Sequence, residues 1–227
     1  MIYVMSDIHG NRKKFDMLLE QIDLKSDDEL YILGDIVDRG ADPIGILRQV
    51  MAMGNAKMLL GNHEYMMLQA YFSQCLPEEE ELCKARWNRN GCDVTINGLN
   101  SLTEEQRMEI FDYVNGLPLN LEISVGGVDY LLVHGFPAEM YGKTEPRILK
   151  NCDVKGFAVW ERMQENDVMP EGKTVIFGHT STDHYQDVIP PSIWYGDRKI
   201  GIDCGGGYGE GGRLSCLRLD DMKEFYA

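Results

Sequence analysis

The residues of this chain that could do chemistry gather just after short apolar runs. Five such runs, at residues 2–5, 30–33, 57–60, 128–133 and 174–177, are each followed closely by carboxylates, an amide or a histidine. The residues concerned are Asp7, His9, Asp35, Asp38, Asn62, His63, His134 and His179. The chain has only five histidines, and four of them occupy these places. One histidine after a strand is usually an ordinary loop residue, but four in equivalent places favour a shared site.

The donor atoms of this set are carboxylate and amide oxygens and imidazole nitrogens, without thiolates. That mixture favours Mn²⁺, Fe or Zn²⁺ over a cysteine-bound zinc or copper ion. Six ligands are too many for one tetrahedral ion, but they suit two ions that share a carboxylate. Two ions about 3.5–4 Å apart can hold a hydroxide and clamp the oxygens of a phosphoryl group during in-line displacement. The pattern therefore indicates a two-metal centre for phosphoryl chemistry.

Alternating strand and helix signals in the first 72 residues would bring these side chains together. Strands are predicted at 2–5, 30–33 and 57–60, and helices at 11–23, from Pro43, and at 65–72. This β-α-β-α-β-α order implies parallel strands with right-handed crossovers. Because ligands of open α/β sheets gather beyond the carboxyl ends of the strands, the sequence predicts that the strand-end residues converge.

The rest of the chain divides into a helical segment and a second set of strands. Residues 77–116 are polar, have a helical pattern and carry no strand signal, so they are predicted to be a helical insert or cap. Strands are then predicted at 119–125, 128–133, 174–177, 200–202 and 214–219. We therefore expect one α/β domain over residues 1–227, with two sheets interrupted once by the insert.

Composition limits the classes of partner. Thirty-seven acidic residues against 22 basic ones give a net charge of −15, which makes a nucleic-acid partner unlikely on electrostatic grounds. We find no apolar stretch long enough to span a membrane, and an acid and a histidine lie within the first nine residues, so a cytoplasmic protein is expected. None of the six cysteines forms a CxxC pair, and reduced thiols are expected.

The motifs SDIHG (6–10), GDIVDRG (34–40) and GNHE (61–64), with the later His134 and His179, resemble the signature of the PPP phosphoprotein phosphatases. That family belongs to the calcineurin-like metallophosphoesterases, and the length and motif spacing are similar to its small bacterial and bacteriophage members. The resemblance implies a four-layer αββα sandwich of two mixed sheets with a helical insert.

The resemblance also implies a role for each residue. Asp7 and His9 would bind the first metal, Asp35 would bridge both, and Asn62, His134 and His179 would complete the second. His63 would be the general acid that protonates the leaving oxygen, with Asp38 favouring its protonated form. Arg39 would grip the phosphate, helped by Asn62 and by Arg162, although a surface role for Arg162 is equally open. Two divalent ions are implied, with Mn²⁺ preferred and Fe or Zn²⁺ as alternatives.

The function implied is a two-metal phosphomonoesterase for phosphoserine and phosphothreonine in proteins, with in-line attack by a metal-bound hydroxide. The alternative is a diadenosine tetraphosphate hydrolase or a broad phosphoesterase for small substrates. Asp38 and Glu64 favour the protein phosphatase, because the tetraphosphatases typically lack that aspartate and read GNHD. A metal-binding regulatory module without turnover is disfavoured by the intact Asp38, Arg39 and His63. The sequence does not indicate an oligomeric state.

Three positions depart from the family pattern. Leu60 stands where many relatives carry an arginine before GNHE, so one phosphate contact is expected to be missing. Ser6 replaces a glycine before Asp7, and Phe136 replaces a second glycine after His134-Gly135, which puts the shape of that loop in question.

Overall fold

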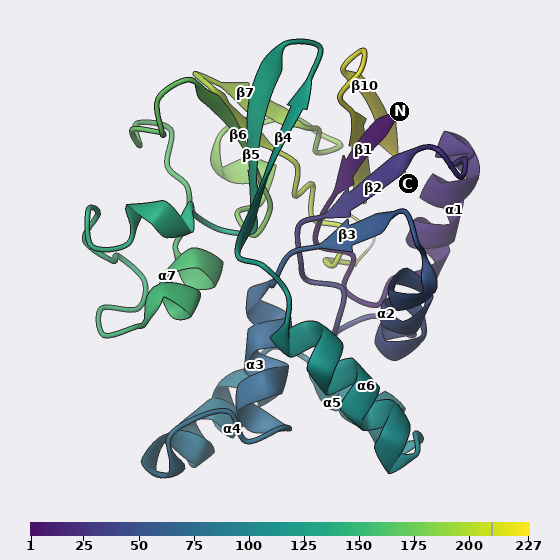
Figure 1. The fold of residues 1–227 in the computed structure, drawn as a ribbon, viewed down its shortest axis with the longest axis vertical. Helices are drawn as coiled ribbons and strands as arrows, with labels where there is room; N and C mark the ends of the chain where they lie inside the picture. Colours follow the sequence, from purple (N-terminus) through teal and green to yellow (C-terminus); the bar gives the residue numbers. More distant parts are fainter. Residues whose placement is uncertain (210) are drawn as a thin grey trace.

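The computed structural model describes residues 1–209 and 211–227, which form two five-stranded mixed sheets (Figure 1). In the first sheet, β1 (Ile2–Met5), β2 (Glu29–Ile32) and β3 (Ala56–Met58) are parallel neighbours. β9 (Ser215–Arg218) and β10 (Lys223–Tyr226) extend it antiparallel beyond β1, giving the order β10-β9-β1-β2-β3. The carboxyl ends of β1, β2 and β3 therefore lie at one edge.

The second sheet is built from the later strands. β4 (Asn120–Val125) and β5 (Val128–Val133) form an antiparallel hairpin across a two-glycine turn. β6 (Lys173–Phe177) pairs parallel with β5, β8 (Lys199–Gly201) pairs parallel with β6, and β7 (Trp194–Gly196) closes the edge antiparallel. The order is β4-β5-β6-β8-β7, so the carboxyl ends of β5 and β6 also share an edge.

Helices follow the first three strands in turn: α1 (Arg12–Ile22), α2 (Pro43–Ala52) and α3 (Asn62–Ala70). The side chains of Asn11 and Asp42 cap α1 and α2, each accepting a hydrogen bond from a backbone N–H three residues further on. Such caps satisfy N–H groups that the first helical turn cannot pair internally. The crossovers predicted from the alternating pattern are thus present.

The third helix begins at Asn62, three residues before its predicted start. Glu64, in the first turn, reaches back and accepts a hydrogen bond from the Gly61 N–H at 3.2 Å. Gly61 has no side chain to accept a bond in return, so this is one half of a capping box, and it satisfies one N–H at the helix start. As a result Asn62 and His63 lie in the first turn of a helix, which holds them more firmly than a loop would.

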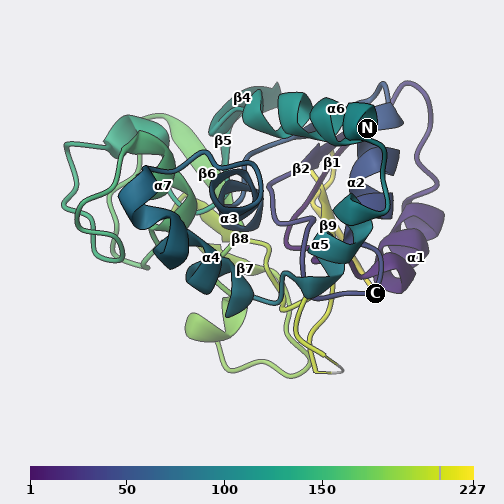
Figure 2. The same ribbon diagram turned by 90° about the horizontal axis from the view of Figure 1, so that it is seen from below.

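The predicted insert at 77–116 contains η1 (Pro77–Glu79), α4 (Glu80–Asn88), α5 (Asp93–Asn100) and α6 (Glu104–Asn115). α4 packs against α3, and α5 packs against α2. Seen from below, α3 lies in the middle, with α4 and α7 to one side of it and α5 and α2 to the other (Figure 2). The insert therefore surrounds the helix that carries Asn62 and His63.

Three apolar layers hold the sheets and helices together. Side chains from both sheets meet between them, including the fully buried Val4, Leu33, Leu132, Ile176 and Leu217. The helices after β1, β2 and β3 cover the outer face of the first sheet, with Phe15, Leu18 and Leu47 among the buried side chains. Burial of this apolar surface is the main stabilising contribution.

On the outer face of the second sheet, α7 (Val154–Trp160) places Phe157 in the same buried apolar cluster as Val133 and Phe177. The 3₁₀ turns η2 (Ala138–Met140) and η3 (Thr182–His184) lie in the loops that follow β5 and β6. The layers are thus helix, sheet, sheet and helix, and the predicted fold class is confirmed.

Three short elements were not predicted from the sequence. β7, β10 and α7 have 3, 4 and 7 residues, too few for a clear period. No helix formed by the described residues is long and apolar enough to cross a membrane. The six cysteines are free thiols. The assignment of the whole chain to a single domain stays a prediction.

Candidate active site

The side chains that follow the five predicted strands meet around Asp35. Ligand atoms of His9, Asp35 and His63 lie within 4.8 Å of one another, and so do those of Asp35, His134 and His179. All of these residues are buried. Asp35 belongs to both groups, which is the arrangement expected of a carboxylate shared by two ions.

The backbone at this site is held in an uncommon conformation. Ten non-glycine residues in the described part of the chain have positive φ, and six of them are predicted site residues. These six are Asp7, His9, Asp35, Asp38, Arg39 and His179. Left-handed backbone costs free energy in residues other than glycine and concentrates at functional sites. This backbone conformation therefore lowers the stability of the fold while it directs these side chains into the site.

The loops that follow β1 and β6 approach each other so closely that residue 178 must be glycine. A Cβ added to Gly178 would lie 2.0 Å from Ser6 Oγ and 2.4 Å from Asp7 Oδ2. Ser6 Oγ donates to Asp7 Oδ2, so the serine that replaces the family's glycine acts as a hydrogen-bond donor to a predicted metal ligand. The substitution at Ser6 is thus more than a small change in a turn.

On one side of Asp35 stand Asp7 and His9. His9 Nε2 lies 3.6 Å from Asp35 Oδ2 and 3.8 Å from Asp7 Oδ1. His9 Nδ1 lies 3.1 Å from the Val37 carbonyl oxygen. Because a carbonyl can only accept, Nδ1 carries the hydrogen, and the Nε2 lone pair faces the two carboxylates. This is how a metal-ligating histidine is usually oriented.

On the other side stand Asn62, His134 and His179. His134 Nδ1 lies 2.7 Å from the Leu33 carbonyl oxygen and so donates to it, which leaves the Nε2 lone pair facing Asn62 Oδ1 at 2.9 Å and Asp35 Oδ1 at 3.5 Å. When Asp35 is ionised, three acceptor atoms thus point at one another without a hydrogen between them. Such a cluster is repulsive unless a cation lies within it, so the donor set fits a metal ion.

His179 joins the two sides of the site. Its backbone N–H donates to Asp7 Oδ2 at 3.0 Å, and its Nε2 donates to the Trp160 carbonyl at 3.2 Å. Its Nδ1 is thereby left as the acceptor nitrogen. Arg162 donates through Nη1 to the His179 carbonyl at 3.0 Å, so it lies beside the site rather than on a remote surface.

Burial shifts the pKa of the aspartate and the pKa of the histidines at this site in opposite directions. Burial, followed by the charges of Asp7 and Glu64, raises the pKa of Asp35 well above its ordinary value. Burial lowers the pKa of His9, His134 and His179. Histidine binds metal in its neutral form, so burial keeps these three imidazoles in the form that binds metal. Burial also destabilises the ionised Asp35 carboxylate when no metal ion is bound.

His63 is arranged differently from the other three histidines, because one of its ring nitrogens contacts a carboxylate at hydrogen-bond distance and the other contacts a guanidinium. Nδ1 lies 2.6 Å from Asp38 Oδ2, and Nε2 lies 3.1 Å from Arg39 Nη2. Burial, then the charge of Arg39, lowers the pKa of His63, whereas burial raises the pKa of Asp38 to about 7. The expected preference for a protonated imidazole is therefore opposed here by burial and by Arg39.

The helical insert holds Asp38 in place, a link that the sequence analysis missed. Trp87 Nε1, from α4, donates to Asp38 Oδ2 at 2.8 Å, and Thr95 Oγ1, from α5, donates to Asp38 Oδ1 at 2.6 Å. The Arg39 N–H donates to the Gly91 carbonyl at 3.0 Å. Only the WNRNGCDVT stretch (87–95), which contains all three partners, could have suggested this contact.

Arg39 lies at the mouth of the site. Its guanidinium carbon is 4.7 Å from the centre of the exposed Tyr208 ring, while Nη2 contacts His63. Nη1 is buried and has no hydrogen-bond partner among the described residues. An unpaired guanidinium nitrogen beside a cluster of metal ligands is suited to a phosphate oxygen.

Two buried carboxylates, Glu64 and Asp203, were not predicted as site residues. Glu64 accepts hydrogen bonds from the backbone N–H groups of Asp35, Ile36, Val37 and Gly61. It therefore shapes the turn after β2 and does not face a substrate. Asp203 is 4% exposed, and burial and then the charge of Asp7 raise its pKa.

The remaining departures from the family pattern lie in the core. Leu60 is 1% exposed, and its N–H donates to the Pro118 carbonyl at 3.0 Å. Phe136 is also 1% exposed and contacts the Phe157 ring edge-on, with centroids 5.6 Å apart. The loop after His134 thus keeps its place by packing a phenylalanine into the core.

Comparison with known proteins agrees with this geometry. The family model described as calcineurin-like phosphoesterase matches residues 1–206. The chain is 32% identical over 135 residues to the symmetrical bis(5'-nucleosyl)-tetraphosphatase of Acidovorax sp. (strain JS42), covering 59% of this chain and 43% of that protein. It is 41% identical over 134 residues to the protein of the same name from Glaesserella parasuis serovar 5, again covering 43% of it. The matches thus span less than half the length of these relatives.

Solved structures share the fold at low identity. A chain described as a candidate diadenosine tetraphosphatase superposes with a TM-score of 0.61 at 22% identity, covering 100% of this chain and 92% of the other. A protein serine/threonine phosphatase from Saccharomyces cerevisiae gives 0.56 at 15% identity, covering 100% and 78%. Because both substrate classes are represented, the fold alone does not choose between them.

Proposed function

The chain belongs to the calcineurin-like phosphoesterase family, and we propose that it is a two-metal hydrolase that splits dinucleoside tetraphosphates symmetrically into nucleoside diphosphates. The hydrolase activity is supported above all by one observation: two groups of possible metal ligands share Asp35. The names of the curated relatives support the substrate class. The match spans less than half of each relative, so the substrate class is part of what we propose.

The ligand roles follow the two sides of the cluster. Asp7, His9 and Asp35 would hold one ion, and Asp35 with Asn62, His134 and His179 would hold the second. Two bound divalent ions, with Mn²⁺ preferred, would supply an activated water and Lewis-acid stabilisation of the phosphoryl oxygens. The protein contributes the fixed geometry, through hydrogen bonds such as that from His9 to the Val37 carbonyl.

Arg39 and Arg162 would position the phosphate chain. The unpaired Nη1 of Arg39 offers one donor, and the planar fork suits two oxygens of one phosphoryl group. Arg162 lies against the His179 carbonyl, from which its guanidinium can reach the same chain. Both arginines would also stabilise the negative charge that develops on the transferred phosphoryl group in the transition state.

The Asp38–His63 pair would deliver a proton to the leaving oxygen. A phosphate anion on Arg39 would offset the guanidinium charge, which is one of the causes that lower the pKa of His63. Asp38, at 2.6 Å from Nδ1, would then stabilise the imidazolium. His63 Nε2 would be the proton-carrying atom on the side of the substrate.

A second candidate, hydrolysis of phosphoserine or phosphothreonine in proteins, is favoured by that same pair. An alkoxide is a poor leaving group and needs a proton, whereas a nucleoside diphosphate leaves readily without one. In the sequence, Asp38 and Glu64 favoured this substrate. Glu64 bonds only to backbone N–H groups, so it carries no preference, and the comparisons favour the tetraphosphate.

The experiment that decides is a side-by-side assay with Mn²⁺. Diadenosine tetraphosphate and a phosphothreonine peptide would be compared at equal concentration, with nucleotide products separated by chromatography. We expect a higher kcat/KM for diadenosine tetraphosphate, with ADP as the only nucleotide product, and loss of activity with a chelator. A higher kcat/KM for the peptide would overturn the substrate assignment, and activity that persists after complete metal removal would overturn the mechanism.

A further inference from the structure

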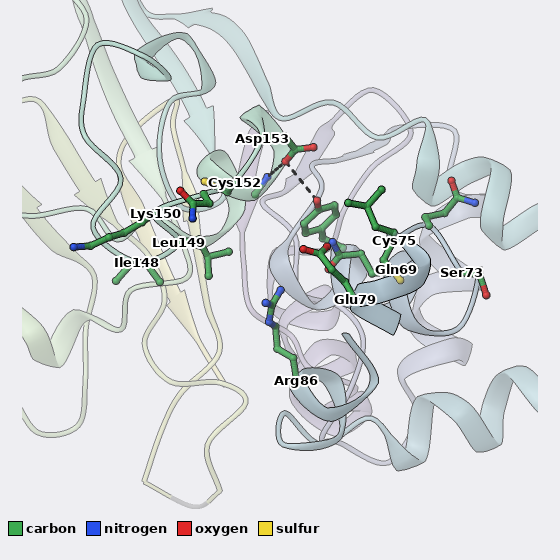
Figure 3. A pocket seen from close by; sticks show the side chains of 15 residues that line it. Gln69, Ser73, Cys75, Glu79, Arg86, Ile148, Leu149, Lys150, Cys152 and Asp153 are labelled. Atoms are coloured by element: carbon green, nitrogen blue, oxygen red, sulfur yellow. Dashed lines mark hydrogen bonds between the residues drawn. The ribbon is translucent and has the colours of Figure 1, made fainter. Parts of the chain in front are cut away.

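A cavity of about 760 Å³ lies between the insert side of the molecule and the segment that precedes α7 (Figure 3). One wall comes from α3 and the region leading into α4, and the other from residues 148–153. The lining includes Tyr65, Gln69, Arg86, Leu149, Lys150 and Cys152. The volume is in the range of small-molecule sites, which is about 300–1,000 Å³.

The cavity adjoins the metal-ligand cluster through Trp160. The Arg86 guanidinium, which lines the cavity, lies 5.8 Å from the centre of the Trp160 ring. The same ring lies 6.2 Å, edge-on, from the ring of His179. Tyr65, which also lines the cavity, lies about one turn along α3 from the predicted ligand Asn62. A ligand with a phosphate chain at the metal site could therefore extend its other end into this cavity.

Gln69, which is one of the lining residues, carries an unsatisfied polar atom. Its Oε1 is buried and has no hydrogen-bond partner among the described residues. Leaving such an atom unpaired costs roughly 1–3 kcal/mol. If the amide turns toward the cavity, a ligand with a donor beside an acceptor would satisfy both of its ends. The edge of adenine presents that pair, and glutamine reads it with two hydrogen bonds.

The other walls suit a flat, neutral ring. The guanidinium plane of Arg86 and the ring of Tyr65 both line the cavity, and nucleobases stack on arginine planes and on aromatic rings. The Tyr65 hydroxyl donates a hydrogen bond to Asp153 Oδ1 at 3.4 Å, which links the two walls of the cavity (Figure 3). Two basic side chains, Arg86 and Lys150, and two acidic ones, Glu79 and Asp153, share the lining, so its charges balance. Arg86 and Lys150 are the two that would favour the start of a phosphate chain.

We infer that this cavity is a nucleoside subsite, which takes a purine nucleoside of the substrate while the phosphate chain runs to the metal ions. The inference deepens the proposed function and rests on it for the identity of the substrate. Gln69 would read the base edge and Arg86 would stack on the base.

Thiol footprinting tests the subsite without turnover. Cys75 and Cys152 line the cavity and are the two cysteines that are only partly buried. In metal-stripped wild-type protein we expect ADP to slow alkylation of both by iodoacetamide at least about threefold, measured by peptide mass spectrometry, and pyrophosphate to leave the rates unchanged. Equal protection by the two compounds, or none by ADP, would overturn the subsite.

Variants provide the second test. For Gln69→Met and Arg86→Met we expect ADP to bind about tenfold more weakly by calorimetry to the metal-stripped protein. We also expect the ratio of kcat/KM for diadenosine tetraphosphate to that for p-nitrophenyl phosphate to fall by a similar factor. Arg48→Met removes the same charge from the exposed face of α2, away from the cavity, and should change neither quantity.

The nucleoside subsite and the proposed substrate can be overturned independently of each other. Protection by ADP together with weaker binding in the variants, but no hydrolysis of diadenosine tetraphosphate, would support the subsite and overturn the proposed substrate. Hydrolysis of that substrate with ratios and binding unchanged in both variants would overturn the subsite and leave the proposed function standing.

Discussion

Two neighbouring regions of the site differ in how their polar atoms are paired. Around Asp35, acceptors face acceptors: His134 Nε2 lies 2.9 Å from Asn62 Oδ1, and His9 Nε2 lies 3.6 Å from Asp35 Oδ2. Around Asp38, every carboxylate oxygen meets a donor, from Thr95 on one side and from Trp87 and His63 on the other. The two aspartates are three residues apart in one turn.

The difference separates an ion site from a proton site. A cluster of acceptors is stable only when a proton or a cation lies within it, so once Asp35 is ionised its region gains stability from metal ions. The Asp38 region is satisfied by the protein alone, so it should keep its geometry with or without metal. Substitutions in the two regions should therefore separate metal content from turnover.

The largest effect is expected for Asp35→Asn, which removes the shared carboxylate. Both ions would lose a ligand, so bound Mn²⁺ should fall to background, and turnover should fall by more than about 10⁴-fold, beyond the loss of a general acid. Metal content by plasma mass spectrometry and turnover of p-nitrophenyl phosphate would be measured together. Asp16→Asn, on the exposed surface of α1, is the matched control. Full occupancy by both ions in Asp35→Asn would refute the shared-ligand assignment.

For His63→Asn we expect loss of turnover with metal retained. Removing the proton donor should cost about 10²–10⁴-fold on phenyl phosphate, whose leaving group needs a proton, and much less on diadenosine tetraphosphate. Bound Mn²⁺ should stay near the wild-type value. His184→Asn, at an exposed histidine, controls for the substitution itself.

Metal loss in His63→Asn would contradict the role given to this histidine, because it would make His63 a ligand. An equal loss of rate on both substrates would instead show that His63 does not act by protonating the leaving group.

The strand-end residues could be predicted from sequence because each follows its own apolar run locally. Asp7, His9 and Asp35 needed only the rule that parallel strands end at one edge. The donors to Asp38 could not be predicted in this way, since Thr95 lies 57 residues away in the chain and reaches it only after α5 packs on α2. Glu64 was misjudged for a similar reason: its motif was visible, but its backbone partners depend on the fold of the turn.

Acidification should separate the two regions further. Burial raises the pKa of Asp35, so in the metal-free protein this ligand keeps its proton to a higher pH than an ordinary aspartate, while burial keeps the three ligand histidines neutral. Binding of a cation must then expel the proton. Below that pKa, Mn²⁺ affinity should fall about tenfold per pH unit. Calorimetry between about pH 8 and pH 5 in two buffers of different ionisation heat would measure the protons released; an affinity independent of pH would contradict the shift.

The smallest effect is expected for Trp87→Phe, which removes one donor to Asp38 and keeps most of the apolar volume. A partner that orients another residue typically contributes about 10–100-fold, and since Thr95 still holds the other oxygen, we expect a loss near the lower end. Trp194→Phe, whose ring stacks on Tyr185 instead, is the matched control. The loss should appear in kcat on phenyl phosphate with metal content unchanged. If bound Mn²⁺ fell in parallel, the proton site and the ion site would not be independent, and the distinction between the two aspartates would fail.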